Sequence, residues 1–120
     1  MASTAAQIET AVRRLQEQVP ALANLKLVFG LELRGRGDIQ LYRVRLPGPE
    51  IRKDLARDER VLVEMDRATF NELAEKGTLK GYRRAYETGH IKAQGDSNVL
   101  KLIGQVVERQ EQRSRLKKAR

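Results

Sequence analysis

The feature that most constrains this chain is an alternation of apolar and polar residues with a period of two. Apolar side chains occupy every second position at Leu25, Leu27, Phe29, Leu31 and Leu33. Successive side chains of a β-strand point to opposite faces, so the pattern predicts a strand with one buried face. Turn residues follow at positions 35–38, and a second strand is predicted over residues 39–46. The two strands should form a hairpin.

The second strand changes its apolar phase along its length. Ile39 and Leu41 share one parity, whereas Tyr42, Val44 and Leu46 share the other. A β-bulge inserts one extra residue and would place both groups on the same face. We therefore expect a bulge near Leu41.

The rest of the chain mixes helices and strands without regular alternation. Before the hairpin, a helix is predicted that Thr4 caps and Pro20 ends. After the hairpin come a weak element at residues 51–55, which is an edge strand or a helical turn, and a strand over 61–65. A helix that Asp66 caps and Gly77 closes, a helix over 79–86, a strand over 90–94, and a last helix that begins at Asp96 or Ser97 complete the chain. This order predicts a single α+β domain with a largely antiparallel sheet. The expected buried residues include Leu27, Phe29, Leu31, Val61, Val63, Phe70, Leu73, Ile91, Leu102 and Val106.

The segment "VLVEMDRATFNELAEKGTLKGYRRAYETGHIKAQGDSNVLKLIGQVVE", which begins at Val61, resembles the second half of the sterol carrier protein type-two family. An alternating strand leads into the acidic cap Asp66 and a helix with Phe70 and Leu73. A glycine, a second helix, a strand over residues 89–96 and an apolar terminal helix follow. The resemblance implies a five-stranded sheet with helices on one face, an apolar tunnel for fatty acyl chains or sterol-like lipids, and no cofactor. The chain departs from the family in a short loop between its second and third strands, in a basic tail, and in His90, where lysine is usual.

The terminal helix carries a wide apolar stripe of Val99, Leu100, Leu102, Ile103, Val106 and Val107, which ceases at Glu108. Such a stripe either completes the core or covers a ligand. Given the resemblance, we interpret the helix as a lid with one side on the sheet and the other on a cavity. The predicted ligand-binding residues are Phe70, Tyr82, Tyr86, Ile103, Val106 and Val107.

No residue pattern indicates catalysis or metal binding. The chain has no cysteine and a single histidine, His90, which is too few ligands for an ordinary zinc site. No nucleophile and orienting acid accompany that histidine at a recognisable spacing, so we expect no catalytic residue. The prediction is a non-catalytic protein that binds or transfers a lipid or another apolar ligand.

The net charge of +8 is concentrated in the tail, where residues 108–120 carry six basic and two acidic side chains. We divide the chain into a lipid-binding domain at residues 1–110 and a basic tail at residues 111–120, which could contact anionic membranes. The basic residues and tyrosines of residues 80–86 leave open an alternative, an adaptor for nucleic acid or an acidic protein partner. A further alternative is an accessory subunit that presents a lipid-like intermediate to an enzyme. The sequence shows no secretory signal or stretch of transmembrane length, which favours a cytoplasmic location, and it leaves the oligomeric state open.

Overall fold

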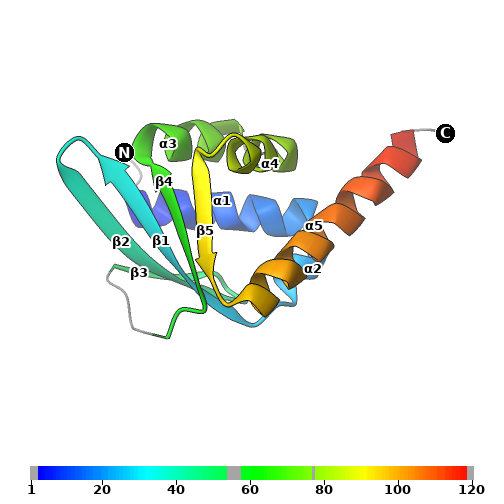
Figure 1. Ribbon diagram of the computed structural model, residues 1–120, viewed down its shortest axis with the longest axis horizontal. Coiled ribbons are helices and arrows are strands. Elements are labelled where there is room, and N and C mark those ends of the chain that lie inside the picture. Colours follow the sequence, from blue (N-terminus) through cyan, green and yellow to red (C-terminus); the bar gives the residue numbers. More distant parts are fainter. Residues whose placement is uncertain (1–2, 54–57, 77, 119–120) are drawn as a thin grey trace.

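The computed structural model describes residues 3–53, 58–76 and 78–118 and forms one sheet with helices on one face (Figure 1). The elements in chain order are α1 (Thr4–Gln18), α2 (Pro20–Ala23), β1 (Leu27–Gly35), β2 (Asp38–Leu46), β3 (Glu50–Lys53), β4 (Val61–Asp66), α3 (Arg67–Lys76), α4 (Leu79–Glu87), β5 (Ile91–Gly95) and α5 (Ser97–Lys118). The five strands lie in the order β3-β2-β1-β4-β5. The strands β1 and β4 are parallel, and the other three pairs are antiparallel. The predicted α+β class with a largely antiparallel five-stranded sheet is confirmed.

The β1–β2 hairpin is regular, and the predicted bulge near Leu41 is wrong. Pairing runs without interruption from Leu27 opposite Leu46 to Gly35 opposite Asp38. The change of apolar phase has another cause, since Tyr42 and Val44 are buried while the side chain of Ile39 is 60% exposed. Ile39 lies on the face of the sheet that the helices do not cover. The apolar residues of this strand are thus divided between both faces.

The core lies between the sheet and the helices α1, α3 and α4. Its buried residues are Ile8, Ala11, Leu31, Leu33, Tyr42, Val44, Leu46, Met65, Phe70, Leu73 and Ile91. Among the residues predicted to be buried, Leu31, Val61, Phe70, Leu73 and Ile91 are buried, whereas Leu27, Phe29, Val63 and Val106 are half-buried. The prediction for Leu102 is wrong, because this side chain is 45% exposed. It lies on the side of α5 that faces away from the body.

Four helix starts have side-chain caps, among them Thr78 at α4, and the cap of α1 differs from the prediction. Ser3, not Thr4, caps α1, since its Oγ accepts a hydrogen bond of 3.1 Å from the N–H of Ala6. The hydroxyl of Thr4 instead accepts a hydrogen bond of 2.7 Å from Arg67. Asp66 caps α3, and Asp96 caps α5 by accepting from the N–H of Asn98 at 2.9 Å. Gly77, the expected end of α3, lies outside the described residues.

The edge strand β3 includes residues 51–53 of the weak element predicted at residues 51–55, whose positions 54 and 55 lie outside the described residues. At the opposite edge, β5 leads into α5, which packs against β5 and α2. The second half of α5 projects from the rest of the molecule (Figure 1). No helix in the described parts of the chain is long and apolar enough to span a membrane.

Candidate functional site

The apolar side of α5 is covered only in part. Its apolar residues Val99, Leu100, Ile103, Val106 and Val107 are all half-buried, and no residue from 97 to 116 is fully buried. A helix whose stripe completes a core would instead contribute fully buried side chains. The face that α5 turns to the body is therefore wider than the contact that it makes there.

The six predicted ligand-binding residues lie in three different environments. Phe70 on α3 is part of the core and is 4% exposed. Tyr82 on α4 is half-buried and packs against the core, whereas Tyr86 on the same helix is 56% exposed. On α5, Ile103, Val106 and Val107 are half-buried. Their joint role in lining a cavity remains a prediction.

An ion pair connects α5 to α4 beyond the apolar stripe. The Arg83 guanidinium contacts the carboxylate of Glu111, and it also pairs with Glu87 one turn along its own helix at 3.0 Å. The Glu111 side chain is only 19% exposed, so the contact is partly sheltered from solvent. The predicted boundary between residues 110 and 111 falls inside α5, which is helical to Lys118.

A shallow open pocket of about 230 Å³ lies at the end of the sheet where β1 and β4 finish and β5 begins. Its lining residues are Arg34, Glu64, Met65, Asp66, Gly89, His90 and Lys92, and it contains none of the six predicted ligand-binding residues. The pocket is small and charged, which does not suit a long apolar chain.

His90 in this pocket forms a hydrogen bond with the side chain of Thr88. The Thr88 hydroxyl lies 2.9 Å from the carbonyl oxygen of Arg84. The same hydroxyl oxygen is 2.8 Å from Nδ1 of His90, and the imidazole tautomer decides which of the two groups donates. The Thr88 hydroxyl thus contacts both the end of α4 and the imidazole of His90.

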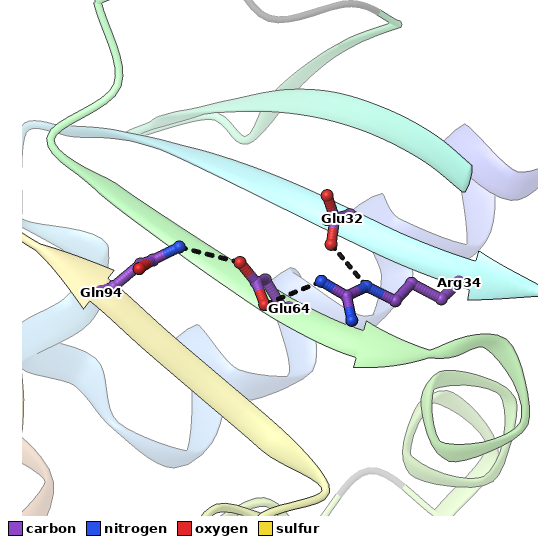
Figure 2. A network of polar contacts seen from close by, with 4 residues as sticks. All are labelled: Glu32, Arg34, Glu64 and Gln94. Carbon is purple, nitrogen blue, oxygen red and sulfur yellow. Dashed lines mark hydrogen bonds and ion pairs between the residues drawn. The ribbon is translucent and has the colours of Figure 1, made fainter.

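Four polar residues form a connected network on the face of the sheet opposite the helices (Figure 2). Glu32 and Glu64 are register partners on the parallel strands β1 and β4, so two like charges lie side by side. Arg34 bridges them, donating from Nε to Glu32 at 2.7 Å and from Nη2 to Glu64 at 3.1 Å. Gln94 donates to the other oxygen of Glu64 at 2.8 Å. The hydrogen bond to Glu32, followed by the charges of both carboxylates, raises the pKa of Arg34.

This network was not predicted from the sequence, because Arg34 and Glu64 are thirty residues apart. Their contact depends on the register of β1 against β4, which no local pattern specifies. The possible signal is the presence of charged residues at alternate positions of both strands. That signal identifies the exposed face of the sheet, but it does not show which charged residues of the two strands pair with one another.

Neither a metal site nor an exposed pair of stacking tyrosines is found in the described parts of the chain. No group of three or more histidine, cysteine, aspartate or glutamate side chains there could hold a metal ion. The nucleic-acid alternative was based in part on Tyr82 and Tyr86, two residues of a type that stacks on bases. Tyr82 packs against the core, so only Tyr86 is well exposed for such a contact.

The fold defines the class of protein first: one α+β domain whose mixed sheet is covered on one face by helices, with a long terminal helix at the β5 edge. No protein-family model matches the chain, and no curated protein sequence does. Solved structures identify the fold as that of the sterol carrier protein type-two proteins. The resemblance stated from the sequence is confirmed at the level of the fold.

Three of these structures superpose on most of the chain. The solution structure of palmitated sterol carrier protein 2 like 2 from Aedes aegypti has a TM-score of 0.58 and 19% identity, covering 83% of this chain and 93% of its own. The crystal structure of the same Aedes aegypti protein has a TM-score of 0.57 and 20% identity, covering 85% of this chain and 94% of its own. The solution structure of the sterol carrier protein domain 2 of Helicoverpa armigera has a TM-score of 0.55 and 12% identity, covering 84% of this chain and 87% of its own.

Proposed function

We propose that the protein binds one apolar lipid, such as a fatty acyl chain, between the helices and the sheet beneath α5. The incomplete burial of the apolar side of α5 is the observation that carries this proposal. A ligand between α5 and the body would cover the apolar surface that α5 now shares with solvent. The solved palmitated form of an Aedes aegypti protein with this fold supports an acyl chain as the ligand.

The driving force is the transfer of apolar surface from water, without chemical change of the ligand. Each buried methylene contributes about 0.8 kcal/mol. Loss of translational and rotational freedom on association opposes this by about 4–15 kcal/mol. Short chains therefore bind weakly, and we expect affinity to rise steeply with chain length. This dependence of affinity on chain length would distinguish an interior site from nonspecific binding to the protein surface.

Replacement of Ile103 by tryptophan tests the site. Ile103 is half-buried on the inner side of α5, so an indole there would occupy the space proposed for the ligand. We expect Ile103→Trp to abolish uptake of a fluorescent fatty acid while the melting temperature changes little. The matched control is Leu102→Trp, because Leu102 is the adjacent residue of the same helix and is 45% exposed. This control should bind the probe like the parent protein.

Two results would contradict the proposal. In a filled interior, Ile103→Trp would overpack and lower stability by about 1–3 kcal/mol. Such a loss, in a protein whose parent never takes up the probe, would show that α5 only completes the core. Native mass spectrometry of freshly purified protein is the second measurement. A co-purified lipid of defined mass would support the proposal directly, and Ile103→Trp should be free of it.

The basic end of α5 would bring the protein to anionic membranes, where lipids are exchanged. Basic residues predominate from Arg109 onward, and the helix that carries them projects from the body (Figure 1). Each such charge close to an anionic surface contributes about 1 kcal/mol of attraction. Leu116 is 70% exposed on this part of α5 and could enter the interface. The proposed role of the tail is therefore transient delivery, separate from the binding of the ligand.

A further inference from the structure

The phenol oxygen of Tyr82 is buried and has no hydrogen-bonding partner. Tyr82 is part of α4 and packs against the core that the helices form with the sheet. Buried hydroxyl groups in folded proteins almost always have a partner, and an exception requires an explanation. A hydroxyl held in this way is a donor available to a group that the protein itself does not supply.

The position of Tyr82 is fixed by close packing at the junction of α1, α3 and α4. A Cβ atom on the preceding residue, Gly81, would lie 2.9 Å from Oγ1 of Thr78 and 3.4 Å from Cδ2 of Leu73, so α4 approaches α3 closely there. Gln18 of α1 accepts a hydrogen bond of 2.7 Å from the N–H of Leu79 at the start of α4. These contacts hold the first turn of α4, which carries Tyr82, against α1 and α3.

The positive charge of Arg14 acts on the Tyr82 hydroxyl. Burial raises the pKa of Tyr82, so the phenol is neutral and a donor at pH 7, and the charge of Arg14 acts on the hydroxyl in the opposite direction. Arg14 is itself held in place, because its Nη1 donates to the carbonyl oxygen of Ala74 at 2.6 Å. A neutral donor beside a fixed cation suits an acceptor that carries a negative charge.

We propose that the Tyr82 hydroxyl donates a hydrogen bond to the carboxylate of a bound fatty acid, with Arg14 as the counter-charge. This inference rests on the proposed function, and it narrows the ligand from apolar lipids in general to single-chain carboxylates. Tyr82 would thereby determine specificity for the head group, while the apolar chain lies between the helices and the sheet. The two tyrosines of α4 then have different roles, because the exposed Tyr86 cannot share this contact.

Tyr82→Phe is the decisive variant, since it removes only the hydroxyl. The matched control is Tyr42→Phe, the same change at a buried tyrosine of β2 whose hydroxyl donates a hydrogen bond to Gln40 at 3.4 Å. Binding of palmitate and of the chain-matched alkane hexadecane is measured by displacement of a pyrene-labelled alkane, which has no carboxylate. We expect Tyr82→Phe to weaken palmitate binding about tenfold or more, because a charge-assisted hydrogen bond is lost. Hexadecane binding by this variant, and palmitate binding by Tyr42→Phe, should stay within about twofold of the parent protein.

A second pair of variants tests the counter-charge. Arg14→Gln should weaken palmitate but not methyl palmitate, whereas Arg13→Gln should affect neither, since Arg13 pairs with Glu9 at 2.9 Å on the surface of α1. Equal palmitate affinity in Tyr82→Phe and in the parent protein would overturn the proposed carboxylate contact while leaving lipid binding intact. A parent protein that binds neither palmitate nor hexadecane would overturn the proposed function and this inference together.

Discussion

Gly95, where β5 ends, should be one of the positions least tolerant of any side chain. Its φ of +138° lies in a region that L-residues rarely adopt, and an added Cβ would collide with the carbonyl oxygen of Arg60 and lie 2.9 Å from Cα of Val61. All of these neighbours are backbone atoms of the adjoining strand, so no rotamer change can relieve the contact. The same carbonyl oxygen accepts a hydrogen bond of 2.9 Å from the N–H of Asp96, which begins the turn into α5.

The expected cost of Gly95→Ala has two parts. Strained backbone geometry contributes about 1–3 kcal/mol. The collision must then shift β4 or β5, and overpacking of this kind costs about 1–3 kcal/mol more. The sum, roughly 2–6 kcal/mol, is a large part of the total stability of about 5–15 kcal/mol that small domains have. Urea unfolding followed by far-ultraviolet circular dichroism measures the difference.

Gly104→Ala is the matched control, and we expect it to raise the stability of the protein where Gly95→Ala lowers it. Gly104 lies within α5, and no atom would be within 4 Å of an added Cβ. Alanine is favoured over glycine in a helix interior by about 0.5–1 kcal/mol, so this variant should be slightly more stable than the parent protein. If Gly95→Ala unfolds at the same urea concentration as Gly104→Ala, the assigned geometry of the β5–α5 connection is wrong.

Two further predictions concern pH and the tail. Hydrogen bonds from Thr69 lower the pKa of Asp66, so Asp66 should stabilise the protein above its unfolded pKa of about 3.9 and lose this contribution as the pH falls through the lower folded value. Asp66→Ala should therefore be less stable than the parent protein by about 1 kcal/mol near neutral pH. In urea unfolding curves, this difference in stability should disappear in strong acid. A difference that does not change with pH would contradict the assigned role of Asp66. Deletion of residues 113–120 should leave the melting temperature nearly unchanged and flatten the salt dependence of binding to anionic vesicles, whereas unfolding would show that the tail is structural.

The β1–β2 hairpin was predictable because its signals are local. The alternation at Leu27, Phe29, Leu31 and Leu33 and the glycine-rich turn at residues 35–38 are sufficient to define the β1–β2 hairpin. The acidic residues Asp66 and Asp96 likewise mark helix starts, since a capping carboxylate needs only the N–H groups two or three residues further on. Such interactions are complete within a few residues of sequence.

The errors arise where a residue's environment depends on distant elements. Ile39 and Leu102 are as apolar as their buried neighbours, yet the structure leaves them 60% and 45% exposed because nothing packs over them. A β-strand with apolar residues in both parities can bulge or expose one set, and only the partner strands decide between these outcomes. For the same reason, no sequence pattern distinguishes the packed Tyr82 from the exposed Tyr86.

The distribution of paired polar groups favours the helical side of the molecule as the place of function. On the open face of the sheet, Arg34 satisfies Glu32 and Glu64, and this network leaves few groups available for a ligand (Figure 2). On the other side, the hydroxyl of Tyr82 is buried without a partner, and the apolar stripe of α5 is incompletely covered. Unmet hydrogen-bonding capacity and exposed apolar surface both cost stability in the free protein. One ligand with a carboxylate and an apolar chain would relieve both costs, which is why we place the lipid between the helices and the sheet beneath α5 and not in the charged pocket around His90.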